Sequence, residues 1–179
     1  SGVRAVIVGA VGIMIFMTIY YIAAGMVASF ALMLNLLLIF GFVVLFRQTL
    51  TLPGLAGVIL TLGMAVDANI LIFERYREER RRGKPMVPSI AAGYSRAFSV
   101  ILDSNLTTIM TGYVLFYLGT PEIKGFAVTL IAGIFASFFT SVFVTRLILS
   151  TLINWGIVKE LKIFELFRID FLQLGIFRL

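Results

Sequence analysis

Residues 52–73 read LPGLAGVILTLGMAVDANILIF, an apolar run in which Asp67 is the only charged residue. A transmembrane helix needs about 20 predominantly apolar residues, whereas a β-barrel strand needs about ten that alternate between polar and apolar. The run is continuous rather than alternating, so it predicts a membrane-spanning helix. Asp67 and Asn69 then lie inside the membrane, where polar side chains are rare and usually functional.

Apolar runs on both sides of this stretch extend the pattern. They cover residues 5–24, 27–46, 98–118 and 126–149. Turn-forming residues separate them, as at Gly119-Thr120-Pro121. We therefore expect an all-α membrane protein with five transmembrane helices over residues 1–150. A cytoplasmic loop is expected over 74–97, and a cytoplasmic amphipathic tail or linker over 151–179.

The composition agrees with a membrane protein and excludes several classes of site. The chain has 179 residues, of which 60% are hydrophobic and 13% charged, and its mean hydropathy is +1.06. Too few charges are available to cover a water-soluble fold of this composition. The sequence contains no Cys and no His, which removes disulfides, thiol nucleophiles, imidazole bases and the usual zinc ligands. We expect neither an enzyme nor a metal site.

The distribution of positive charge predicts the orientation. Lys and Arg gather in residues 74–97 and in the tail, and we assign only Arg4, Arg47 and Lys124 to the other side. Short segments rich in Lys and Arg stay in the cytoplasm. This rule places the loop and the C-terminus in the cytoplasm and the N-terminus outside. An odd number of spans requires opposite ends as well.

The arginines after the third run have more than one interpretation. These arginines are Arg75, Arg77, Arg80, Arg81 and Arg82. We interpret them as a topology signal that also contacts anionic lipids. Docking of a cytoplasmic partner is the alternative, and nucleic acid is not expected.

Asp67 is the candidate functional residue. At 1.5 Å per residue it lies about 9 Å inside the boundary at Phe73, and Asp103 lies about 8 Å inside the boundary at Phe98. An antiparallel pair of helices therefore places Asp67 level with Asp103 to Thr107. We interpret Asp67 as a site that binds and releases a proton. The alternative is a carboxylate that only fixes helix packing.

The neighbouring polar residues are assigned supporting roles. They are Asn69, Asp103, Asn105, Thr107 and Thr108. Asp103 and Thr107, four residues apart, share one face of their helix. The threonines can simply bond back to the preceding turn. Two roles stay open for Asn69: it joins two helices, or it orients Asp67. No Lys or Arg is expected at the depth of Asp67, so a counter-charge would come from another chain.

Several of these stretches resemble a known family. Residues 63–75, GMAVDANILIFER, closely resemble the fourth membrane helix of SecD, and residues 97–108, AFSVILDSNLTT, resemble its fifth. Residues 123–130, IKGFAVTL, continue the match into the sixth helix. The resemblance covers roughly residues 3–150. It identifies the chain as similar to the C-terminal membrane part of SecD, in the SecD/SecF family of Sec-translocon accessory subunits.

This resemblance implies a fold and a function. SecD and SecF form a bundle of the RND superfamily with six helices from each, and the first helix and periplasmic head of SecD would precede residue 1. Proton flow through the bundle drives the head, which pulls or holds preproteins emerging from the SecYEG translocon. Asp67 matches the proton-coupling residue of the family. Its partner carboxylate and arginine belong to SecF, fused or separate, and no cofactor other than protons is implied.

Two other functions stay open at this point. The bundle could be an assembly scaffold that holds SecF and the translocon without carrying protons. It could also be half of another RND exporter, for lipids or drugs, although such proteins lack the long block around Asp67.

Overall fold

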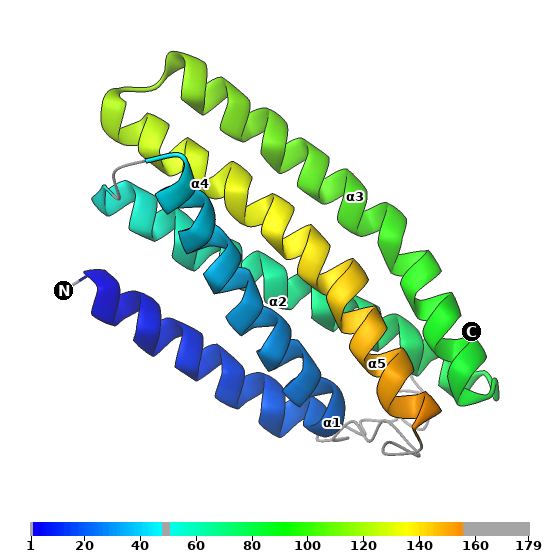
Figure 1. Ribbon diagram of the computed structural model, residues 1–179. Coiled ribbons are helices and arrows are strands. Elements are labelled where there is room, and N and C mark those ends of the chain that lie inside the picture. Colours follow the sequence, from blue (N-terminus) through cyan, green and yellow to red (C-terminus); the bar gives the residue numbers. More distant parts are fainter. Residues whose placement is uncertain (1, 48–50, 156–179) are drawn as a thin grey trace, which may run out of the picture.

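The computed structural model describes residues 2–47 and 51–155, and all regular structure in these ranges is helical. The helices run back and forth as a bundle (Figure 1). The elements are α1 (Gly2–Leu45), α2 (Leu52–Arg81), α3 (Met86–Leu118), α4 (Pro121–Phe138), a π-helical segment η1 (Phe139–Val144) and α5 (Thr145–Asn154). The predicted tail over 151–179 lies outside the described residues, except for the end of α5 and Trp155.

Helix α1 consists of two arms that lie side by side. Ile22 has non-helical dihedral angles (φ 47°, ψ −113°), and the chain reverses direction there (Figure 1). The returning arm begins so close to the first that a Cβ on Gly25 would overlap the carbonyl of Met17. The Ser29 hydroxyl donates to the Met14 carbonyl at 3.3 Å and ties the arms together. The arms correspond to the runs predicted over 5–24 and 27–46.

Helix α2 begins at a capped end and extends beyond its apolar part. The backbone N–H of Gly54 donates to Thr51 Oγ1 at 3.2 Å, which satisfies one of the free donors of the first turn. The segment predicted as a loop over 74–97 is instead mostly helical: α2 continues to Arg81, and α3 already begins at Met86. Ion pairs three residues apart, such as Arg75–Glu78 at 2.9 Å, stabilise this polar extension.

The connection from α2 to α3 is fastened by Glu79. Its side chain has no exposed surface, and its carboxylate contacts the Arg82 guanidinium at 2.9 Å, the Arg96 guanidinium at 2.8 Å and the Lys84 ammonium. The hydrogen bond from Lys84, followed by the charges of Arg96 and Arg82, holds the pKa of Glu79 below its usual range although desolvation opposes this. We call this cluster the Glu79 clamp. It joins the end of α2 to the connection and to α3.

Close packing through small residues holds α4 against α2. A Cβ on Gly133 would overlap Thr61, and Thr129 Oγ1 donates to the Gly54 carbonyl at 3.1 Å. Glycine at such contacts lets helix backbones approach each other, as is common between membrane helices. The run predicted over 126–149 lies within the continuous stretch formed by α4, η1 and α5.

Three described stretches are long and apolar enough to cross a membrane: Gly2–Leu45, Leu52–Arg81 and Pro121–Asn154. Helix α3, which contains the run predicted over 98–118, is not among them, and it carries Asp103, Asn105 and several threonines. Many large apolar side chains face outward; Leu118 is 84% exposed and Val8 71%. Exposed apolar surface of this extent is expected of a membrane protein. The number of five spans and their orientation stay predictions.

Candidate functional site

Asp67 lies at a cavity between α2 and α3. The cavity has a volume of about 250 Å³ and its lining comes from both helices. Its lining residues are Met64, Asp67, Ala68 and Leu71 from α2, and Ile101, Ser104, Asn105 and Thr108 from α3. Within each set the residues are three or four positions apart or adjacent, so each set forms one helix face. The Asp67 side chain is exposed rather than enclosed.

The structure changes which residues of α3 accompany Asp67. From the sequence, Asp67 was expected level with Asp103 to Thr107, and Asp103 and Thr107 were expected to share one face; neither of these two lines the cavity, and both are exposed. The reason is the rotation of α3, which packs through Ile101, 3% exposed. Positions 104, 105 and 108 share the face of Ile101, whereas positions 103 and 107 lie away from it. Of the supporting residues named on α3, Asn105 and Thr108 therefore line the cavity, and Asp103 and Thr107 do not.

Asn105 contributes a free donor to this cavity. Its side-chain nitrogen is buried and has no hydrogen-bond acceptor among the described residues. An unsatisfied buried donor costs about 1–3 kcal/mol. A hydrogen bond from this amide to a water oxygen or to a carboxylate lowers that cost. The cavity therefore combines an acidic side chain with a polar donor that lacks an acceptor.

The threonines of α3 bond to their own helix. Thr107 Oγ1 donates to the Asp103 carbonyl and Thr108 Oγ1 to the Ser104 carbonyl, each at 2.9 Å. These are the back-bonds that the sequence analysis considered. Thr108 nevertheless presents its side chain to the cavity, which Thr107 does not.

Asn69 faces a different neighbour from Asp67. Its amide nitrogen donates to the Ala65 carbonyl at 3.1 Å, and its oxygen accepts from Thr145 Oγ1 at 3.2 Å. Thr145 also donates to the carbonyl of Thr140 in the π-helical segment at 3.0 Å. This geometry favours the first of the two roles considered for Asn69, that of joining helices.

The loop arginines stand at one end of the bundle. The turn of α1, the α2–α3 connection and the end of α5 lie at this same end (Figure 1). Arg77 pairs with Glu74 at 3.5 Å, and the Tyr21 hydroxyl near the turn of α1 donates to Glu74 at 3.2 Å. Arg80 donates to the Lys84 carbonyl at 2.9 Å.

Arg146 is a charged residue that the sequence analysis overlooked. It lies within the run predicted over 126–149, and its guanidinium carbon stands 5.8 Å from the centre of the Tyr94 ring. A lone arginine near the end of an apolar run was the signal that could have found it. In residues 2–47 and 51–155, no cluster of three or more Asp and Glu residues could hold a metal ion.

Comparisons with known proteins identify the family. A family model described as "Protein export membrane protein SecD/SecF, C-terminal" matches residues 1–155. Among curated proteins, the protein translocase subunit SecD of Koribacter versatilis is 52% identical over 154 residues, covering 86% of this chain and 29% of the relative. SecD of Magnetococcus marinus is 49% identical over 163 residues, covering 91% and 31%. The chain thus spans about a third of the length of these relatives.

A solved structure has the same arrangement of helices. The crystal structure of SecDF from Thermus thermophilus, described as a translocon-associated membrane protein, is 37% identical and superposes with a TM-score of 0.83. The match covers 88% of this chain and 22% of that chain. Together with the family model and the curated relatives, this likeness shows that the chain belongs to the SecD/SecF family of protein export membrane proteins and corresponds to a C-terminal membrane part of SecD.

Proposed function

We propose that this chain is the proton-coupling part of a protein translocase subunit in a bacterial inner membrane. Asp67 alternately holds and releases a proton, and the resulting movement of α2 against α3 is passed to a periplasmic head that acts on preproteins. The partners in this proposal are SecF, fused or separate, and the SecYEG translocon. Five spans place the N-terminus outside and the C-terminus in the cytoplasm.

The observation that carries the proposal is the cavity shared by Asp67 and Asn105. An ionised carboxylate inside a membrane costs about 2.5–3.5 kcal/mol on insertion scales. The free amide donor of Asn105 stabilises the ionised form, while the apolar surroundings stabilise the protonated form. Adding or removing one proton therefore changes the contact between α2 and α3, which is the change that a proton-driven motor requires.

The exposure of Asp67 supports a partner from another chain. Among the described residues, Asp67 forms no ion pair, and its side chain faces outward. A carboxylate exposed to lipid is expensive unless another group covers it. We assign this cover to SecF, and contact with anionic lipids to the loop arginines.

The orientation has separate support. The loop arginines, the Glu79 clamp and the turn of α1 gather at one end of the bundle (Figure 1). Positive residues favour the cytoplasmic side. That end is therefore assigned to the cytoplasm.

The test is Asp67→Asn in the intact translocase, with Asp103→Asn as its matched control. Both variants remove one carboxylate from a similar depth, but only Asp67 lines the cavity. We expect Asp67→Asn to abolish the stimulation of preprotein export by the proton gradient while assembly with SecF persists. Asp103→Asn is expected to keep most of that stimulation.

The scaffold alternative gives the opposite result. If the bundle only holds its partners, export in the Asp67→Asn complex responds to the proton gradient as in the wild type. Infrared titration of the Asp67 carboxyl then shows no change of protonation between about pH 5 and pH 9, the range in which a proton carrier must change its charge.

A further inference from the structure

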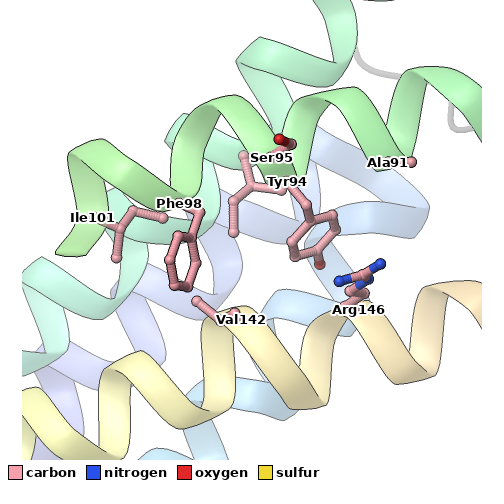
Figure 2. Close-up of a pocket in the computed structure, with 8 residues that line it drawn as sticks. Ala91, Tyr94, Ser95, Phe98, Ile101, Val142 and Arg146 are labelled. Carbon is pink, nitrogen blue, oxygen red and sulfur yellow. The ribbon is translucent and has the colours of Figure 1, made fainter.

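Arg146 is a cation without a carboxylate partner. Among residues 2–47 and 51–155, no carboxylate forms an ion pair with its guanidinium, and the side chain is exposed. The neighbouring group is the ring of Tyr94, 5.8 Å away. The two side chains point toward each other across the space between α3 and α5 (Figure 2). The charge is thus held at a defined place by an aromatic face but is not neutralised.

Tyr94 supplies a second unsatisfied group. The residue is 5% exposed, and its hydroxyl is buried without a hydrogen-bond partner among the described residues. A buried tyrosine hydroxyl normally has a partner. A guanidinium and a free hydroxyl side by side offer several donors to one acceptor group that carries negative charge.

The space around Arg146 is large enough for such a group. Arg146 and Ala91 line two cavities, one of about 280 Å³ and one of about 260 Å³. Ser95 adds a hydroxyl to the first, and Ser150 adds one to the second. The first cavity lies between α2, α3 and the continuous stretch of η1 and α5, and the second lies between α3 and α5. Together they form what we call the Arg146 cleft.

The depth of the cleft matches the headgroup region of a bilayer. Ile72 lines the first cavity, one residue before the boundary predicted at Phe73. On the side toward the membrane interior, large apolar side chains are exposed: Phe98 by 40% and Phe143 by 57%. A cation and hydroxyls at headgroup level, followed by exposed apolar side chains, match the two parts of a phospholipid. A soluble phosphate has no acyl chain that could contact these apolar side chains.

We propose that the Arg146 cleft binds an anionic phospholipid. The guanidinium of Arg146 pairs with the lipid phosphate, the Tyr94 hydroxyl donates to the same phosphate, and the acyl chains lie against Phe98 and Phe143. Basic pockets between helices on the cytoplasmic side bind such headgroups in other membrane proteins. The site uses the membrane placement proposed above but does not depend on proton coupling by Asp67.

The experiment uses the intact subunit in phosphatidylcholine vesicles that contain spin-labelled phosphatidylglycerol. The fraction of immobilised label is measured at about 1 M salt, where the screening length is about 3 Å and diffuse attraction by surface charges is suppressed. We expect Arg146→Gln to weaken binding about tenfold, as loss of a charged hydrogen bond does, and Tyr94→Phe about threefold. Arg146→Lys is expected to retain most of the binding.

The matched control is Arg4→Gln, which removes one exposed guanidinium that does not line the cleft. It is expected to leave the binding unchanged at high salt. Equal effects of Arg4→Gln and Arg146→Gln overturn the proposal, as does equal immobilisation of labelled phosphatidylcholine. Displacement of the label by millimolar inorganic phosphate also overturns it, because the site would then serve a soluble anion. Should Arg146→Gln not fold, unchanged binding in Tyr94→Phe overturns the proposal. A loss of about threefold in Tyr94→Phe, with most of the binding kept in Arg146→Lys, supports it.

Discussion

Two buried asparagines, Asn35 and Asn69, show how much depends on a single residue. Asn35 has no exposed surface, and neither its amide nitrogen nor its oxygen has a partner among the described residues. Asn69 is 1% exposed and bonds to Ala65 and Thr145. The same side chain therefore carries an uncompensated desolvation cost in one place and joins two helices in the other.

This contrast predicts opposite effects for one substitution. Asn35→Leu should raise the free energy of unfolding by about 1–2 kcal/mol, because it removes buried polar atoms that have no partner. Asn69→Leu should lower it by about 1–2 kcal/mol, because the Ala65 carbonyl and Thr145 lose a hydrogen bond. Unfolding of the intact subunit in mixed micelles, followed by circular dichroism, measures both. Destabilisation by Asn35→Leu would mean that its amide is satisfied in the assembled protein.

The sequence was informative about the residues of the site and less so about the direction of each side chain. Asp67 stood out because it is a carboxylate within an apolar run. The sequence left open which face of α3 meets Asp67, because Asp103 and Thr107 are spaced as regularly as Ser104 and Thr108. Only the packing of Ile101 against α2 decides between the two faces. Arg146 went unnoticed because its role depends on Tyr94, which lies 52 positions earlier in the chain.

At the scale of elements, the reversal within α1 depends on a glycine. The first and second arms meet where a Cβ on Gly25 would overlap the Met17 carbonyl. The position of the reversal was predicted by the break between the apolar runs over 5–24 and 27–46. The positive φ of Ile22 could not be predicted, since a β-branched residue rarely adopts such a conformation.

We predict that Gly25→Ala destabilises the subunit by about 1–3 kcal/mol, as other substitutions that overpack a tight contact do. Gly12→Ala is the control, because it lies in the first arm with nothing within 4 Å of the added methyl group. It should be neutral or slightly stabilising. Thermal unfolding in detergent compares the two, and equal effects would contradict the close contact.

The connection between α2 and α3 depends on the Glu79 clamp. Its lowered pKa means that the folded state holds the ionised form more firmly than the unfolded chain does. The resulting stabilisation is complete above the ordinary pKa of glutamate and is lost as the pH falls through the lowered value. This pH dependence belongs to a hairpin of two helices rather than to the bundle as a whole.

Glu79→Gln should therefore lower the melting temperature at neutral pH. It should also make the melting temperature change less as the pH is lowered. The difference in melting temperature between the wild type and the variant should shrink as the pH falls below about 4.5, where the unfolded-state carboxyl becomes protonated. Thermal unfolding from neutral to acidic pH measures this difference. Glu78→Gln is the control, since its carboxylate is exposed and pairs with Arg75. A difference that stays constant with pH would contradict the role of the ionised carboxylate.

At the scale of the whole molecule, composition predicted the class of protein correctly but not the extent of each helix. The apolar runs defined the parts of the helices that can lie in lipid. The polar continuations of α2 and α3 fall within the segment predicted as a cytoplasmic loop, because hydropathy detects the membrane and not the helix itself. Ion pairs such as Arg75–Glu78, together with the Glu79 clamp, keep these continuations helical.

The π-helical segment has a consequence for anyone comparing chains of this kind. Each of its turns holds about one residue more than an α-helical turn, so a helical wheel drawn straight through residues 121–154 loses phase after Phe139 by about 100°. Thr145 contacts Asn69, and Arg146 contacts Tyr94, only because the π-helical turn before them accommodates one extra residue. A related sequence that is one residue shorter between 139 and 144 would form a regular α-helix there and would keep both contacts. An alignment gap at this place therefore indicates that the geometry is conserved.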